Sequence, residues 1–166
     1  RMKKILLTIL TIGILAFLGY CGIEMSQLAN GVKKDTVRLE NFRLDNKIQN
    51  GDIIFQTSKS SQSKAIQLAT NSKYSHMGII FENDGQFFVY EAVQPVKLTP
   101  LKEWINRGEN DHYVIKRLEN ADQVLDSSTL TKMKKIGEQF KGKPYDIYFE
   151  WSDEKIYCSE LVWKIY

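Results

Sequence analysis

The chain has 166 residues, of which 43% are hydrophobic, and this amount of apolar material suits one compact domain rather than two. Arg1, Lys3 and Lys4 account for the formal charge of +3, because the 20 basic residues left of the 23 balance the 20 acidic ones. Such a balanced body lacks the basic stripe that is typical of nucleic-acid binding, and we expect no nucleic-acid partner.

Residues 1–23 have the pattern of a secretory signal peptide or an N-terminal membrane anchor. Two lysines precede an uncharged run, residues 5–23, which is long for a cleaved signal and marginally long enough to span a bilayer. Lipidation is a third alternative, because Leu18-Gly19-Tyr20-Cys21 loosely resembles a bacterial lipobox. All three alternatives predict export to the periplasm or cell envelope, with residues 5–23 as a membrane tether where they are retained.

A folded domain is predicted over residues 50–166, after a polar tether or short helix at residues 24–49. A short apolar strand, Ile53–Phe55, follows the turn at Asn50-Gly51-Asp52. The next element is a helix that ends near Asn71, with the serine cluster at 60–63 as its cap. Its apolar face is formed by Ala65, Ile66, Leu68 and Ala69.

A β-hairpin is the clearest local prediction, with strands at Met77–Phe81 and Gln86–Val93 around the turn Asn83-Asp84-Gly85. Further elements follow in chain order: a short helix over Leu101–Asn106, a strand over Tyr113–Leu118, a helix over Leu125–Lys141, and a last helix that begins at Cys158. This order predicts an α+β domain with a small antiparallel sheet.

Cys158 is the candidate nucleophile. If the signal is cleaved or the N-terminus stays in the membrane, Cys158 has no partner for an intramolecular disulfide. Because an exported protein lies in a compartment that usually oxidises thiols, a lone thiol there needs a reason. At the first turn of a helix, unpaired backbone N–H groups and the helix dipole favour the thiolate. The alternative is that Cys158 is a small buried apolar residue.

His76 is the candidate base, because it precedes an apolar strand that would hold its backbone rigid, whereas His112 follows a polar turn and is expected at the surface. Glu91 lies at a similar height on the partner strand, where its carboxylate would orient the imidazole; the alternative is an edge-strand glutamate that faces water. The two histidines lie far apart and the cysteines lack paired spacing, so we expect no metal and no cofactor.

Six segments resemble the YaeF/YiiX group of permuted papain-like amidases. They are Asn50–Phe55, Ser61–Thr70, Tyr74–Gly78, Tyr90–Val93, Gly142–Asp146 and Tyr157–Lys164. The resemblance implies a circularly permuted NlpC-type cysteine peptidase fold, in which the histidine precedes the cysteine, and a triad of Cys158, His76 and Glu91. Family members continue past the cysteine helix, so it also implies that part of the pocket or a covering segment lies beyond residue 166.

The predicted activity is hydrolysis of an amide bond through a thioester, with a peptide or a peptidoglycan stem peptide as the substrate. The backbone N–H groups of Cys158 and Ser159 are candidate oxyanion donors. Tyr145, Tyr157 and Ser75 are further candidates for oxyanion or substrate binding, and both tyrosines have a plain core role as the alternative. Two other functions stay open: a lipid or acyl-ester hydrolase or acyltransferase at the membrane, and a catalytically silent surface binding module. The sequence does not indicate an oligomeric state.

Overall fold

An antiparallel sheet of five strands, in the order β4-β3-β2-β1-β5, is the centre of the fold. The computed structural model describes residue 27 and residues 48–166, of which Ile48–Tyr166 forms one unit. The predicted signal or anchor and most of the predicted tether lie outside the described residues. Within the part of the chain that the structure describes, no helix is both long and apolar enough to cross a bilayer.

The elements alternate in a mixed order that confirms the predicted α+β class. The strands are β1 (Ile53–Ser58), β2 (His76–Asn83), β3 (Gln86–Glu91), β4 (Lys97–Pro100) and β5 (Gly108–Lys116). The helices are α2 (Ser63–Thr70), α3 (Leu101–Asn106), α4 (Ala121–Val124), α5 (Ser127–Phe140) and α6 (Cys158–Ile165). The strand β4 and the helix α4 were not predicted, and β5 begins at Gly108, before the predicted Tyr113.

The hairpin of β2 and β3 turns at Asp84 and Gly85, whose φ angles of 51° and 76° are both left-handed. Two such residues make the tight turn that suits the right-handed twist of the flanking strands. The predicted hairpin is therefore confirmed, with β3 ending at Glu91 and not at Val93.

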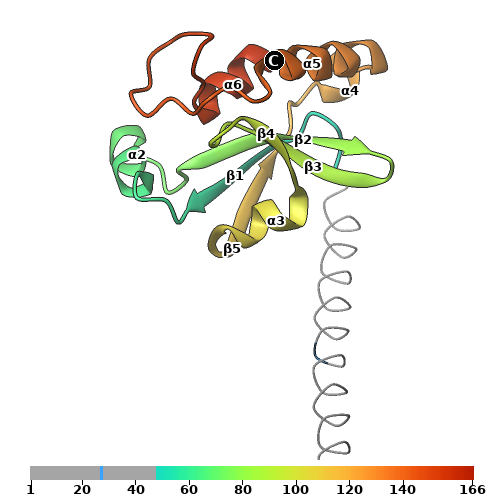
Figure 1. Cartoon of the computed structure of the whole chain (residues 1–166). Coiled ribbons are helices and arrows are strands. Elements are labelled where there is room, and N and C mark those ends of the chain that lie inside the picture. Colours follow the sequence, from blue (N-terminus) through green and yellow to red (C-terminus); the bar gives the residue numbers. More distant parts are fainter. Residues whose placement is uncertain (1–26, 28–47) are drawn as a thin grey trace, which may run out of the picture. The chain divides into compact units, whose positions relative to one another are not determined.

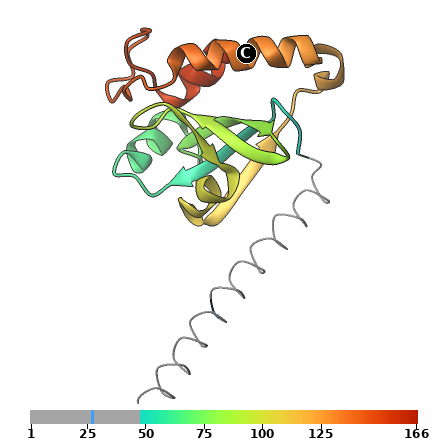
Figure 2. The same cartoon turned by 45° about the vertical axis from the view of Figure 1, so that its right-hand side comes forward.

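The helices α5 and α6 cover one face of the sheet, as the two views in Figures 1 and 2 show. Buried side chains from β2, β3 and both helices form the core there, with Ile79, Tyr90, Met133, Leu161 and Ile165 among them. In α5, the residues Met133, Gly137 and Phe140 are buried, at the spacing of one helical face. The hydroxyl of Tyr90 donates a hydrogen bond of 2.6 Å to the Gly137 carbonyl, and a side chain at 137 would press on the Tyr90 ring.

The helix α2 forms where it was predicted, but its apolar face is not buried. Ala65, Leu68 and Ala69 are exposed, with 72% of Leu68 accessible, and only Ile66 is half-buried. The serine cluster does not cap the helix through a side chain, because the N-cap is Gln62 and its side chain makes no capping bond. Ser63 instead points inward, and its hydroxyl lies 2.7 Å from that of Ser75.

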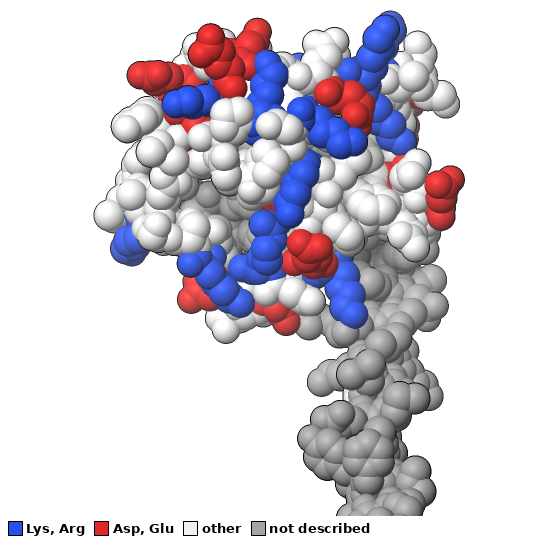
Figure 3. Space-filling model, in the orientation of Figure 1, with Lys and Arg blue, Asp and Glu red and all other residues white. Residues whose placement is uncertain are grey.

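Basic and acidic side chains lie together on the face of the molecule drawn in Figure 3. This mixture is the surface expected from a body whose positive and negative residues are equal in number.

Candidate active site

Cys158 and His76 meet at one end of the sheet, because each is the first residue of its element. His76 begins β2 and Cys158 begins α6, which packs on β2. The thiol of Cys158 interacts with the imidazole of His76 and with the backbone of Met77 and of Ser159. Cys158 is 8% exposed and forms no disulfide. The sulfur therefore lies beside both the imidazole and the start of a helix.

The charged forms of this pair are favoured over the neutral forms. Burial lowers the pKa of His76, but hydrogen bonds to Cys158 and Glu91 and their charges raise that pKa to about 9. Burial also raises the pKa of Cys158, but the hydrogen bond and charge of His76, with the two backbone bonds, hold it below its usual value. The arrangement can therefore hold a thiolate beside an imidazolium, and a thiolate is the reactive nucleophile.

Glu91 is fully buried, and its Oε2 lies 2.6 Å from Nε2 of His76. Since Ile79 pairs with Tyr90, the residue directly opposite Glu91 is Gly78, and His76 lies one diagonal step further along β2. The predicted meeting is thus diagonal, and not directly across the strands. A side chain at Gly78 would collide with Val89 and with the Tyr90 carbonyl. Glycine at this position therefore lets β2 and β3 lie close together beside His76 and Glu91.

Two residues that the sequence did not single out hold the Glu91 carboxylate. Its Oε1 accepts hydrogen bonds from Thr99 on β4 and from the Arg107 guanidinium, which follows α3. Burial raises the pKa of Glu91, but the bonds from His76 and Thr99 and the charge of Arg107 bring it below its usual value. Glu91 is therefore an anion with defined partners, and the predicted alternative of a water-facing glutamate is wrong.

The indole of Trp104 stacks on the His76 ring, with centroids 5.9 Å apart and planes inclined by 25°. Trp104 is fully buried on α3. The imidazole is thus held by the aromatic plane of Trp104 and by its contacts with Glu91 and Cys158. Because Nε2 faces Glu91, the other ring nitrogen, Nδ1, is left for the thiol.

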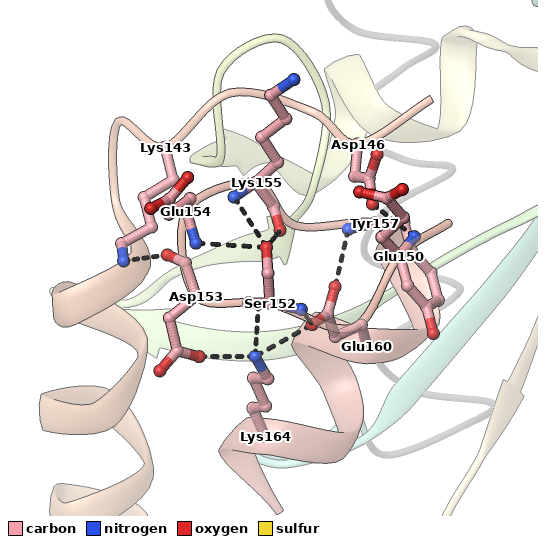
Figure 4. A network of polar contacts seen from close by, with 10 residues as sticks. All are labelled: Lys143, Asp146, Glu150, Ser152, Asp153, Glu154, Lys155, Tyr157, Glu160 and Lys164. Atoms are coloured by element: carbon pink, nitrogen blue, oxygen red, sulfur yellow. Dashed lines mark hydrogen bonds and ion pairs between the residues drawn. The ribbon is translucent and has the colours of Figure 1, made fainter. Parts of the chain in front are cut away.

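The irregular segment before α6 is held by two buried carboxylates, drawn in the network of Figure 4. Asp146 accepts the backbone N–H groups of Tyr148 and Glu150, at 2.9 and 2.6 Å. Glu160 accepts those of Ser152 and Tyr157, at 3.2 and 3.3 Å. The ammonium of Lys164 lies 2.9 Å from Glu160 and 2.5 Å from Asp153. Together these bonds fix the backbone that leads into Cys158.

The lesser candidates take different places. Ser159 is exposed, and its backbone is bonded to the sulfur of Cys158. Tyr145 and Tyr157 are half-buried, and burial together with nearby charge, including that of Cys158, raises the pKa of both phenols. The Ser75 hydroxyl is buried, where it accepts the Ser58 N–H at 2.9 Å and pairs with Ser63. The predicted surface residue His112 is exposed and stacks on Tyr74.

A cysteine at a helix start that faces a histidine on a sheet, with the histidine earlier in the chain, is the arrangement expected of a permuted papain-like protein. The family model described as permuted papain-like amidase enzyme, YaeF/YiiX, C92 family, matches residues 47–166. The chain belongs to this family.

Two relatives from Escherichia coli are similar over most of this chain. The uncharacterized protein YiiX of strain K12 is 52% identical over 118 residues, which are 71% of this chain and 57% of that protein. The crystal structure of "metalloprotein yiiX" from strain O157:H7 has a TM-score of 0.67 and 52% identity, over 71% of this chain and 64% of that one. The chain thus spans less than two thirds of the length of either relative.

Proposed function

We propose that this chain is a cysteine amidase, in which Cys158 is the nucleophile, His76 the general base and acid, and Glu91 the residue that orients His76. The observation that carries the proposal is the place of His76 between two groups: the Glu91 carboxylate, 2.6 Å from Nε2, and the thiol of Cys158, which interacts with the imidazole. Membership of an amidase family supports an amide as the bond that is cleaved.

The reaction follows the chemistry of acyl transfer. The Cys158 thiolate attacks the substrate carbonyl carbon, and a C–S bond forms as the carbonyl oxygen becomes an oxyanion. The imidazolium of His76 then gives its proton to the amide nitrogen, the C–N bond breaks, and an amine leaves. Water next attacks the thioester while His76 takes its proton, and the C–S bond breaks to release the carboxylic acid.

Backbone N–H groups at the start of α6 are the oxyanion donors that we propose, at Cys158 and Ser159. Donors of this kind are preorganised by the helix and stabilise the charge that develops on the oxygen. The Ser159 backbone is bonded to the sulfur in the resting site. We therefore expect it to shift from the sulfur to the oxyanion as the new bond forms. Tyr145, beside the sulfur, is a further donor candidate.

One relative is described as a metalloprotein, which raises the question of a metal here. Among residue 27 and residues 48–166, no group of three or more His, Cys, Asp and Glu side chains is arranged to hold a metal ion. The described residues therefore do not fit a metal centre.

The substrate that we propose is a short peptide or a peptidoglycan stem peptide, met outside the cytoplasm. The apolar run at residues 5–23 supports export, and its retention would hold the domain at the membrane. Incubation of the full chain with muropeptides and, separately, with lipid esters, followed by mass spectrometry, tests this choice. New free amines from muropeptides are expected, and release of fatty acid alone would favour the lipid enzyme.

The role of Cys158 is tested with Cys158→Ala. We expect turnover to be lost, and labelling by iodoacetamide to be lost at residue 158 as read by peptide mass spectrometry, while the circular dichroism spectrum and the thermal transition are retained. Full activity in this variant would remove the proposal. Ordinary thiol behaviour of Cys158, with labelling that rises only above pH 8, would instead favour a silent binding module.

A further inference from the structure

A cavity of about 660 Å³ opens beside His76, at the end of the sheet where β1 stops and β2 begins. Its walls come from α2, from the segment after β3, from the end of α3 and from the segment that contains Tyr145. Tyr145, in the wall of the cavity, feels the charge of Cys158, and His76 lines the cavity directly. This position suits the part of a substrate that lies next to the reacting carbonyl.

Gln56 is a buried polar residue among those that line this cavity. Gln56 is 2% exposed and lies directly across from His76 in the ladder of β1 and β2. Its Oε1 is buried and has no hydrogen-bond partner among the described residues. A buried acceptor without a donor is unfavourable, and an N–H group of a ligand would satisfy it.

The backbone around Gln56 is shaped to leave room for this carboxamide. A Cβ atom at Gly108 would lie 2.2 Å from Oε1, so a larger residue there would require the carboxamide to move. The pairing of β1 with β5 also shifts its register between Gln56 and Ser58, next to the same group. The amide thus lies where β1 and β5 meet, in the wall of the cavity.

The charge of the cavity is positive. Lys59 and Arg107 line it, and no aspartate or glutamate is among the lining residues that the structure describes. One nitrogen of Arg107 bonds to Glu91, while its Nε is buried without an acceptor. Lys59 is exposed at the rim, 3.5 Å from the Asn106 carbonyl. Glu91 is largely committed to its own partners, so the rim cation is left to attract an anion.

We propose that this cavity binds a peptide that carries a carboxylate, with Gln56 accepting a peptide N–H and Lys59 attracting the carboxylate. The inference deepens the proposed function and rests on it for the bond that is cleaved. The cavity is expected to attract peptides with a net negative charge and to repel peptides whose only charge is an ammonium group.

The charge of the cavity is tested without any turnover, through the labelling of Cys158. The ratio of the rate constants for iodoacetate, an anion, and iodoacetamide, its neutral analogue, is measured for the full chain and for Lys59→Met. We expect the ratio to fall about two- to fivefold, the range for one exposed charge pair. The matched control is Lys64→Met, which removes the same charge from an exposed site on α2 outside the cavity lining. An equal ratio in the two variants would overturn the role of Lys59.

The role of Gln56 is tested with Gln56→Met, which keeps the length of the side chain and removes the carboxamide. For acetyl-peptides with a free C-terminal carboxylate, kcat/KM is expected to fall about tenfold, the size of one lost hydrogen bond to a buried partner. Labelling by methyl methanethiosulfonate, which contains no amide, is expected to stay within about twofold, since the thiolate is untouched. Unchanged peptide turnover, or an equal loss of labelling, would overturn the assignment.

Two further measurements keep the outcomes separate. If Gln56→Met loses its thermal transition, Gln56→Glu replaces it, and the added negative charge is expected to lower turnover of carboxylate peptides more than that of their C-terminal amides. If the full chain cleaves no peptide at all, the proposed function fails, and the iodoacetate ratio still decides the charge of the cavity. Turnover with no preference for a carboxylate would overturn this inference and leave the proposed function in place.

Discussion

The two sides of the site are held by different kinds of interaction. His76 lies on β2, between β1 and β3, and is itself paired with Gln56 of β1. Glu91 bonds to three neighbours around it. Cys158 instead follows an irregular segment whose ordered ladder is one isolated bridge, from Tyr145 to Ile156. In this segment, hydrogen bonds from backbone N–H groups to the carboxylates of Asp146 and Glu160 fix the backbone, as strand pairing does around His76.

The difference teaches where the site is sensitive. Strand pairing positions the backbone through many hydrogen bonds. The part of the site that holds the base, His76, therefore depends on side chains only for the charge and the tautomer of the imidazole. The nucleophile side depends on a few buried carboxylates for its geometry, and it also carries exposed aromatic residues, with Tyr148 at 71% and Trp151 at 57%. One substitution should therefore alter chemistry on the base side and alter backbone position on the nucleophile side.

Among the variants that keep the nucleophile, the largest effect is expected from His76→Ala. Without the imidazole, the pKa of Cys158 loses the group that lowers it, and no base remains for proton transfer. Turnover should fall about a thousandfold and labelling by iodoacetamide at pH 7 at least about tenfold. His112→Ala, at the exposed histidine, is the matched control and should change neither rate. Labelling of the His76 variant at the rate of the unaltered chain would contradict the ion pair.

Glu91→Gln should have the next largest effect. The neutral amide no longer stabilises the imidazolium, and Arg107 loses its carboxylate partner. We expect turnover to fall on the order of a hundredfold. The free energy of unfolding in urea should fall by roughly 2 to 4 kcal/mol. The control is Glu109→Gln, at an exposed glutamate on β5. Equal urea midpoints for the two variants would show that the buried carboxylate stabilises nothing.

Glu160→Gln tests the nucleophile side. The amide cannot replace a carboxylate that bonds to two backbone N–H groups and to Lys164, so the segment before Cys158 should loosen. The free energy of unfolding is expected to fall by about 1 to 3 kcal/mol, and labelling of Cys158 should change severalfold. The His76 pKa, followed by NMR, should move little. Glu154→Gln, in the same segment but exposed, is the control, and a large shift of the His76 pKa would link the two sides.

The smallest effect is on the pH dependence of stability. His76 binds its proton more tightly in the folded chain, so its contribution is complete below 6.5 and is lost as pH rises through its folded pKa of about 9. The Cys158 pKa is lowered, so its contribution is present above the ordinary value of 9.0 and is lost as pH falls through the lowered one. The pair needs both charges, and its effect should be greatest between the lowered Cys158 pKa and about pH 9.

The measurement is the free energy of unfolding of the unaltered chain minus that of Cys158→Ser, between pH 5 and pH 10. Serine keeps the shape of the side chain and does not ionise in this range. We expect a difference on the order of 1 kcal/mol that shrinks on both sides of the window. A difference that stays constant across the whole range would mean that the pair is neutral.

Local patterns were enough to predict several elements of the fold. The left-handed turn at Asp84 and Gly85 is a short-range signal, and so is the apolar spacing of α5 and α6, so the hairpin and both helices were found where they form. The four-residue strand β4 was missed because it is short and lies at the sheet edge, and its Pro100 weakens any strand pattern.

The sequence by itself determined which groups carry charge, which segments are apolar, and that a cysteine begins a helix. Residue type and short spacing decide these properties. Only the tertiary structure decided that Glu91 crosses to His76 diagonally past Gly78, that Thr99 and Arg107 hold its carboxylate, and that Gln56 lies across from His76 with an unpartnered oxygen. These contacts depend on the register of the strands and on the neighbours that bury each polar group. Both are determined by residues that lie far apart in the chain.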